Sequence, residues 1–368
     1  MVDAKWLDDT LAKVARKVEA ECKRLDGEIP YMAIDGSYKN YGKLQTHWWT
    51  NGFWGGMLWQ LYNVTGQDVF RKTASDLEDK LDGVLAEFLG LHHDVGFMWL
   101  HTAVANYRNT GNEQSFRRGL HAAGILAGRY NPSGKFINAW NDECMGWMII
   151  DCMMNLPLLY WASKHNNLTH YDFIAREHAN KTLDVLMRGD GSVHHISVLD
   201  KVSGEPLEFP RGQGYVSGSS WSRGHGWAIY GFALSYRYTG DERYLDAAKK
   251  TAHYFMVNTP DGVPLVDFRA PQEPKLIDTT AGLIASCGLL EIAGHVGEFE
   301  KNMYEAHAKK IIKATAEQHA DYDTERDGII GNGSEAYHDA KVHVPIIYGD
   351  YFFIEAILRL MGKGFHIW

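Results

Sequence analysis

The chain has few cysteines for its length. Among 368 residues there are 4, at Cys22, Cys144, Cys152 and Cys287, and their spacing is not typical of a zinc site. A chain this long can bury a large core and does not need disulfide bonds to hold it. We therefore expect reduced thiols and a cytoplasmic location.

The sequence also lacks long runs of one residue type. No cluster of lysines and arginines appears and the formal net charge is −9, so we expect no nucleic-acid partner. No stretch of about 20 apolar residues is present that could span a membrane. The segment 1–6 has no apolar run typical of a signal peptide. We expect no membrane association, and a monomer or weak homo-oligomer.

Aromatic residues, by contrast, are plentiful: 12 Trp, 19 Tyr and 15 Phe. Large rings contribute most to the packing of a core. Their flat faces also stack on sugar rings. We expect most of them in the core and a few in a binding site.

A repeated unit organises the chain. An apolar segment rich in Gly, Ala, Trp and Leu is followed by a short turn and then by an amphipathic segment, as in 244–255, where apolar residues recur with a helical period. The turns contain Gly66, Gly111, Gly240 and Gly297. Each glycine is expected to end the preceding helix in the left-handed conformation.

Six apolar segments predict buried helices, because each is hydrophobic on most faces. They are 53–62, 97–108, 151–163, 227–238, 280–292 and 351–360. With a first outer helix at 4–24 and the amphipathic partners, they give six pairs. Such pairs extend as a solenoid or close into a ring. We expect an all-α fold, an (α/α)6 toroid with six inner and six outer helices, as one catalytic domain over 1–368. The clearest strand is 192–199, as part of a small hairpin.

Each predicted inner helix begins at polar residues. The clusters are 48–52, 92–96, 151, 222–227, 278–280 and 348–350. Parallel inner helices would bring them to one face, where free N–H groups and helix dipoles favour an anionic ligand. Because Asp is a common N-cap, we expect Asp278 and Asp350 to serve in capping or packing. Adjacent histidines rarely chelate one ion, so His92 and His93 do not predict a metal site.

Asp151 is harder to explain as a cap. It interrupts the otherwise apolar run 147–161 together with Asn155, four residues on and therefore on the same helical face. An apolar wall disfavours the charged form of a carboxyl group, which is the environment of carboxylic general acids. A buried, satisfied Asp–Asn pair is the alternative. Arg223 suits a carboxylate ligand, an aromatic stack or a buried ion pair.

Five longer segments, 49–54, 92–97, 150–161, 221–234 and 349–356, resemble the unsaturated glucuronyl hydrolases, family 88 of the glycoside hydrolases. The resemblance covers nearly the whole chain, from about residue 10 to the end. It implies an (α/α)6 barrel that removes a 4,5-unsaturated uronic acid from the end of a lyase-generated oligosaccharide. The reaction it implies is hydration of the C4=C5 enol ether, with no metal or organic cofactor.

Residue by residue, the resemblance implies Asp151 as the general acid/base and Asp94 as a carboxylate that holds ring hydroxyls and influences the proton on Asp151. The implied substrate-binding residues are Trp49, His195 (or the adjacent His194), Gln213, Trp221, Arg223, Trp227 and Lys341. Members that prefer sulfated disaccharides carry Ser-x-x-Ser-x-Lys, whereas residues 336–341 read Ala-Tyr-His-Asp-Ala-Lys. The missing serines, and the negative charge of Asp339, argue against a strong sulfate preference.

Three alternatives stay open. An unsaturated rhamnogalacturonyl hydrolase would share the fold and act on pectin fragments, although the segments 92–94 and 151–157 favour the glucuronyl family. A conventional glycosidase would use two carboxylates on a saturated bond. A non-catalytic sugar-binding toroid, or an isomerase, could use the same fold, since fold alone does not set function.

Overall fold

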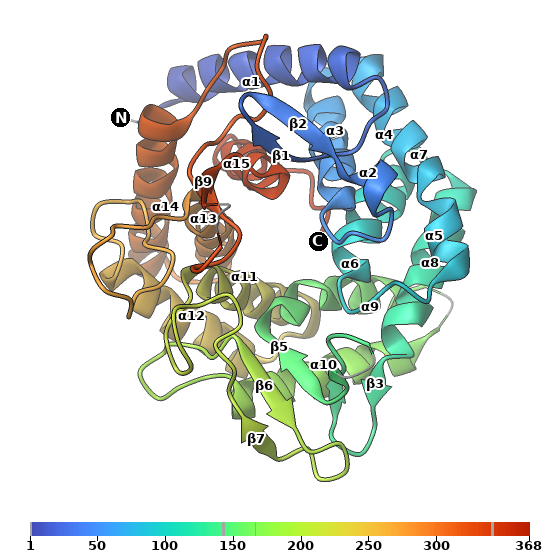
Figure 1. Cartoon of the computed structure of the whole chain (residues 1–368), viewed down its shortest axis with the longest axis vertical. Coiled ribbons are helices and arrows are strands. Elements are labelled where there is room, and N and C mark those ends of the chain that lie inside the picture. Colours follow the sequence, from blue (N-terminus) through green and yellow to red (C-terminus); the bar gives the residue numbers. More distant parts are fainter. Residues whose placement is uncertain (1, 142–143, 166, 340–341) are drawn as a thin grey trace.

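The computed structural model describes residues 2–141, 144–165, 167–339 and 342–368. Within these ranges, helices pair into a closed ring with an inner and an outer layer (Figure 1). The outer helices are α1 (Ala4–Leu25), α4 (Asp68–Lys80), α8 (Glu113–Ala127), α10 (Thr169–Val185), α12 (Glu242–Val257) and α14 (Glu298–His319). The inner ones are α3 (Asn51–Thr65), α6 (Val95–Trp99) with α7 (Ala105–Thr110), α9 (Leu156–Ser163), α11 (Ser222–Thr239), α13 (Thr279–Ala293) and α15 (Ile347–Leu360). The predicted toroid is confirmed.

The ring closes where its last inner helix meets its first. Helix α15 packs on both α13 and α3, and α1 packs on α15 and α4. Two short helices, α2 (Tyr41–Leu44) and α5 (Asp82–Glu87), lie in the connections. In the described part of the chain, no helix combines the length and apolar character needed to cross a bilayer.

Each outer helix buries one stripe of mainly apolar side chains against the inner layer. In α12 the predicted positions are buried, including Tyr244, Ala248 and Phe255, while Glu242 and Arg243 face solvent. Asp241 caps the helix by accepting a hydrogen bond from the Arg243 N–H at 3.1 Å. Burial of such a stripe, rather than helix propensity, holds an amphipathic helix in place.

The inner helices are buried on nearly all faces, and glycine sets how closely they approach. A Cβ added at Gly288 of α13 would lie 2.8 Å from Ile229 Cγ2 and 2.9 Å from the Tyr230 nitrogen on α11. Any larger residue would push these two helices apart. The apolar, glycine-containing segments therefore form the inner layer because they bury well and pack closely.

Two inner helices are less regular than predicted. The segment 97–108 contains a π-helical turn, η1 (Leu100–Val104), between α6 and α7. There the His101 Nδ1 contacts the Phe97 carbonyl oxygen at 2.6 Å, and the Thr102 hydroxyl donates to the Met98 carbonyl at 2.8 Å. Two side chains thus hydrogen-bond to main-chain carbonyl oxygens inside the π-helical turn.

The predicted helix 151–163 begins as a 3₁₀-helix, η3 (Ile150–Met154), and becomes α-helical only at Leu156. Pro157 lies in the first turn of α9, where its missing N–H costs nothing. Asp151 is therefore held in a tight turn at the entrance of the helix.

Small antiparallel sheets lie in the connecting loops: β1 (Pro30–Ile34) with β2 (Ser37–Asn40), β3 (Tyr130–Asn131) with β4 (Phe136–Ile137), and β8 (Gly333–Ser334) with β9 (Val342–Val344). The predicted strand 192–199 is β6 (Ile196–Leu199), which forms the expected hairpin with β7 (Pro206–Glu208). It also pairs with β5 (Trp147–Ile149), where Ile149 faces Ile196. This sheet brings the chain before Asp151 beside the chain after His195.

Three of the four predicted glycine caps are confirmed: Gly66, Gly111 and Gly240 have φ of 68°, 72° and 68°. The fourth prediction, Gly297, is wrong. Its φ is −67° and it is the N-cap of α14, because α13 already ends at Ala293 with Gly294 as its C-cap.

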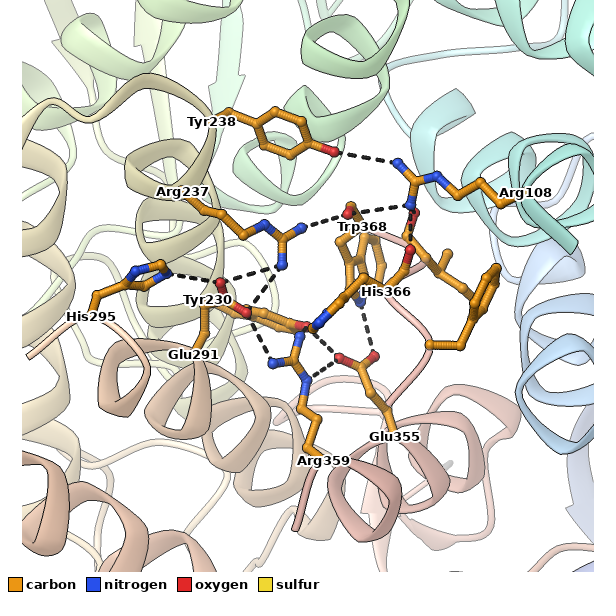
Figure 2. A network of polar contacts seen from close by, with 12 residues as sticks. Arg108, Tyr230, Arg237, Tyr238, Glu291, His295, Glu355, Arg359, His366 and Trp368 are labelled. Atoms are coloured by element: carbon orange, nitrogen blue, oxygen red, sulfur yellow. Dashed lines mark hydrogen bonds and ion pairs between the residues drawn. The ribbon is translucent and has the colours of Figure 1, made fainter. Parts of the chain in front are cut away.

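The C-terminal segment fills the end of the ring at which the inner helices finish (Figure 2). Trp368 is 1% exposed, stacks on Phe352 and donates its indole N–H to Glu355 Oε2 at 2.9 Å. Its main-chain carbonyl oxygen accepts hydrogen bonds from Arg108 and Arg237. We call this end of the ring the floor and the opposite end the mouth.

Candidate active site

A cavity of about 200 Å³ lies at the mouth, where the N-terminal ends of the inner helices converge. Trp49 precedes α3, Asp94 precedes α6, Asp151 is in η3, Arg223 is in the first turn of α11 and Tyr348 is in that of α15. The predicted convergence of polar clusters is therefore confirmed. The lining residues are Tyr31, Trp48, Trp49, His92, His93, Asp94, Trp140, Ile149, Asp151, Gln213, Arg223, Glu335 and Tyr348.

A larger cavity of about 890 Å³ opens beside the mouth, lined by residues that include Phe88, Ile125, Arg129 and Met145. Among the residues that the structure describes, its lining is mostly apolar and includes no carboxyl group. The described lining of the smaller cavity includes carboxyl groups, among them Asp94 and Asp151, so the smaller cavity is the candidate active site.

Two buried carboxyl groups face the small cavity. Asp94 and Asp151 are 8% and 9% exposed. The Asn155 amide donates to Asp94 Oδ1 and to the Asp151 carbonyl oxygen, both at 3.3 Å, and its own oxygen accepts the Phe97 N–H at 2.8 Å. Asn155 thus satisfies Asp94 and the main chain of Asp151. It does not form the satisfied side-chain pair with Asp151 that was the structural alternative.

Burial raises the pKa of Asp94 well above the usual range, and the negative charge of Asp151 raises this pKa further. The Asn155 hydrogen bond works in the opposite direction but is outweighed. Asp94 therefore favours its protonated, uncharged form.

His92 and His93 flank Asp94. Their Nδ1 atoms lie 3.3 and 3.4 Å from its two carboxylate oxygens. Burial lowers the pKa of His92 to about 4 and lowers that of His93 well below the usual range, so both imidazoles are neutral. With Asp94 they form a group whose ligand atoms lie within 4.8 Å of one another, the residue types that could hold a metal ion.

His195 and Trp221 lie behind Asp151. His195 Nε2 is 3.5 Å from Asp151 Oδ1, and the His195 ring lies 4.2 Å from the Trp221 ring. The His195 Nδ1 accepts the Gln213 N–H at 3.0 Å. The Gln213 side chain donates to the Glu335 carbonyl oxygen at 2.6 Å, so it both lines the cavity and anchors the opposite loop.

The adjacent His194, the alternative to His195, points elsewhere: it stacks on Phe209 at 4.0 Å and hydrogen-bonds Arg188. The geometry thus selects His195 of the two, because His195 alone of this pair contacts the Asp151 carboxyl group.

Arg223 forms the buried ion pair that was one of its three alternatives, with Asp278 Oδ2 at 3.1 Å. Its guanidinium also lies over Trp221 and Tyr348, at 4.6 and 5.2 Å from their ring centroids. It donates to the Glu335 carbonyl oxygen at 2.7 Å. The side chain nevertheless lines the cavity, so the ion pair orients a positive group there.

Asp278 and Asp350 serve in capping and packing, as expected. Asp278 accepts the Thr280 N–H at 3.0 Å at the start of α13. Asp350 accepts the Ile330 N–H at 2.7 Å and the Tyr38 hydroxyl at 2.7 Å. Both carboxylates order the loops around the mouth.

The remaining predicted substrate-binding residues differ in where they lie relative to the cavity. Trp49 lines the cavity and stacks on Tyr348, with ring centroids 5.3 Å apart. Trp227 is fully buried, packs on Phe97 and is not among the lining residues. Lys341 lies outside the described residues.

Several wall residues were not predicted as site residues. Tyr31 comes from β1 and donates its hydroxyl to Glu335 Oε1 at 3.0 Å, and Trp140 comes from the loop before β5. Tyr31 lies in a short strand and Trp140 in a loop, and neither segment has a helical period from which its position could be predicted. Tyr348, in the cluster that precedes the sixth inner helix, had a signal in the sequence.

The carboxyl groups and tryptophans at the mouth of the helical ring suit an enzyme that acts on sugars. A scan of protein-family models gives no match. An unsaturated glucuronyl hydrolase of Bacillus sp. (strain GL1) is 37% identical over 96% of this chain and 95% of its own length.

Solved structures agree. The crystal structure of the unsaturated glucuronyl hydrolase from Bacillus sp. GL1 has a TM-score of 0.92 at 34% identity, over 96% of both chains. A Streptococcus agalactiae unsaturated glucuronyl hydrolase variant complexed with dGlcA-GalNAc6S has a TM-score of 0.87 at 26% identity, over 100% of this chain and 94% of the other. The chain belongs to the unsaturated glucuronyl hydrolase family.

Proposed function

We propose that the enzyme removes the non-reducing terminal 4,5-unsaturated uronic acid of a lyase-generated oligosaccharide by adding water across C4=C5, with Asp151 as general acid and base. The pair of buried carboxyl groups, Asp94 and Asp151, in a cavity of about 200 Å³ carries this proposal. So small a cavity suits one terminal sugar. The names of the relatives and the dGlcA-GalNAc6S bound to one of them support the substrate class.

The chemistry needs one proton donor that is regenerated. Asp151 gives its proton to C4, which forms the C4–H bond while positive charge develops at C5 and the ring oxygen. Water then forms the C5–O bond and returns a proton to the Asp151 carboxylate. The C5 hemiketal opens by cleavage of its bond to the ring oxygen, and C1, now a hemiacetal, releases the next sugar as an alcohol. The sum consumes one water and transfers no electrons.

The surrounding residues bind and orient the sugar. Asp94, whose raised pKa favours its protonated form, donates or accepts a hydrogen bond at the ring hydroxyls and keeps a negative charge away from Asp151. Arg223 and the converging helix N-termini attract the substrate carboxylate. Trp49 provides a flat face for stacking, with Gln213 at the opposite wall.

A panel of lyase-generated disaccharides tests the function. Loss of the ultraviolet band of the conjugated double bond should occur with unsaturated chondroitin or hyaluronan disaccharides. Asp151→Asn should reduce turnover about 10²- to 10⁴-fold while calorimetry still detects binding. The surface variant Asp190→Asn is the control, since Asp190 pairs with exposed Arg269 away from the cavity.

The panel separates the alternatives when unsaturated rhamnogalacturonan and a saturated glucuronide are added to it. Persistence of the band with every wild-type reaction contradicts the proposal. Turnover confined to unsaturated rhamnogalacturonan would indicate the pectin-directed sister activity. Turnover of a saturated glucuronide would indicate a conventional glycosidase.

We also propose that the enzyme prefers substrates without sulfate. The Glu335 side chain lines the cavity, and the following segment 336–341 lacks both serines of the sulfate-associated pattern. A carboxylate in the cavity wall repels a sulfate group that comes close to it. The ratio of kcat/KM for an unsulfated disaccharide to that for its 6-sulfated counterpart should exceed one, and a ratio below one contradicts this preference.

A further inference from the structure

The position of His195 is fixed by the sheet that precedes the catalytic turn. Its carbonyl oxygen accepts the Ile150 N–H at 3.0 Å, directly before Asp151. The side chain is buried and lies against Trp221. The ring therefore has little freedom to turn, and its two nitrogens meet different partners.

The partner of Nδ1 determines where the ring proton lies. Nδ1 accepts the Gln213 main-chain N–H at 3.0 Å. A main-chain N–H can only donate, so Nδ1 carries the lone pair and the proton of the neutral ring is on Nε2. Nε2 faces Asp151 Oδ1 at 3.5 Å, and neither atom has a hydrogen-bond partner among the described residues.

The approach of the Gln213 N–H depends on Gly212. Its φ is +57°, which side chains rarely adopt, and a Cβ built there would lie 2.0 Å from His195 Nδ1. Any side chain would both strain the backbone and push the peptide away from the ring. The absence of a side chain at this position is thus required for the contact.

We propose that the Gly212–Gln213 peptide locks His195 in its Nε2–H tautomer, which makes His195 a fixed hydrogen-bond donor to the carboxylate that Asp151 becomes after protonating C4. This role rests on the proposed function and deepens it. His195 neither gains nor loses a proton: the proton leaves Asp151 for C4, and water supplies its replacement. The 3.5 Å separation shortens to a hydrogen bond as negative charge develops on Asp151.

The tautomer can be measured without any substrate. ¹⁵N NMR of protein labelled at histidine, with His195 identified by the signal missing from His195→Gln, should show an unprotonated Nδ1 and a proton on Nε2 at neutral pH. A proton on Nδ1, or a charged ring, overturns the proposal. This holds whether or not any tested disaccharide is hydrolysed, so failure of the lock and failure of the proposed function are distinguishable.

Two matched amide variants test the donor. Glutamine places an N–H near the position of Nε2, whereas asparagine places its amide near Nδ1. His195→Gln should keep at least tenfold more kcat than His195→Asn, with KM changed less than threefold between them. Equal kcat values for the two variants would contradict the assignment of the His195 Nε2–H as the donor to Asp151.

A matched glycine pair tests the lock. Gly212→Ala should lower kcat at least tenfold and alter the His195 nitrogen signals. Gly218→Ala is the control, because Gly218 also has positive φ, +76°, in the same loop but nothing within 4 Å of an added Cβ. Equal losses in both variants, or unchanged His195 signals in a folded Gly212→Ala protein, would show that backbone strain alone matters.

Discussion

The mouth and the floor of the ring treat buried polar groups differently. At the mouth, several buried atoms have no hydrogen-bond partner among the described residues: Asp151 Oδ1, His93 Nδ1, His195 Nε2 and Arg223 Nε. At the floor, the single side chain of Arg359 contacts three partners, Glu355, Glu291 and Tyr230 (Figure 2). Unsatisfied groups cost stability unless a ligand pairs with them. The mouth thus leaves charged and imidazole groups open to a ligand, whereas the charged groups of the floor pair with one another.

The carboxyl groups at the two ends shift in opposite directions. Near the mouth, burial and the charge of Asp350 raise the pKa of Glu21 to about 8, and burial raises that of Asp350 to about 6. At the floor, burial raises the pKa of Glu291, but the charge of Arg359, a hydrogen bond with His295 and the charge of Arg237 outweigh it and lower the pKa. Alkaline pH should therefore weaken the mouth and leave the floor intact.

Breaking the floor should have the largest effect on stability. Arg359→Met leaves Glu291 and Glu355 buried without their central cation, which should cost about 3 to 5 kcal/mol of unfolding free energy in a denaturant titration. Arg243→Met is the control, since Arg243 is an exposed partner of Asp241 and should cost less than about 1 kcal/mol. A loss no larger than that of the control would show that the floor is not the structural anchor.

Glu21→Gln should reduce the loss of stability that alkaline pH causes near the mouth. Because the pKa of Glu21 is raised from 4.5 to about 8 in the folded protein, its stabilising contribution is complete below pH 4.5 and lost as pH rises through 8. Each pKa unit corresponds to about 1.4 kcal/mol. The melting temperature of the variant should fall less between pH 6 and 9 than that of the wild type. Glu19→Gln on the same helix, where Glu19 pairs with exposed Lys23, should follow the wild type.

Asp94→Asn should separate activity from stability at the mouth. The raised pKa of Asp94 means that its contribution to stability is present below pH 3.8 and lost as pH rises through the folded value. The variant should therefore be more stable than wild type at pH 8, yet turn over substrate at least tenfold more slowly. Lower stability at pH 8 would contradict this assignment.

The smallest effect is expected at a helix end on the floor side. Gly240 has φ of +68° and nothing within 4 Å of an added Cβ, so Gly240→Ala should cost about 1 kcal/mol from backbone strain alone. Its kcat should equal that of wild type, unlike Gly212→Ala at the mouth. A reduced kcat would mean that the two ends are not independent.

The sequence predicts what local patterns encode. Alternation of apolar and amphipathic segments predicts the paired ring, and polar residues at the start of each apolar segment predict that Trp49, Asp94, Asp151 and Arg223 meet. Both follow from helical periodicity and from the parallel direction of the inner helices.

What the sequence does not predict depends on contacts between distant segments. The π-helical turn at 100–104 follows from side-chain hydrogen bonds to main-chain carbonyls. Tyr31, in β1, and Glu335, directly after β8, form a hydrogen bond at the cavity wall although they are 304 residues apart in sequence. The position of the Gln213 N–H on His195 depends on the tertiary approach of one loop to a sheet, which no local pattern reports.

The binding of the Trp368 carbonyl oxygen by Arg108 and Arg237 has a practical consequence for handling the protein. Because Trp368 is 1% exposed and lies inside the ring, a bulky label attached to this segment would have to displace its packing. Asp3, at the start of α1, is exposed. Labels and surface attachment for binding measurements therefore belong on exposed residues at the start of α1.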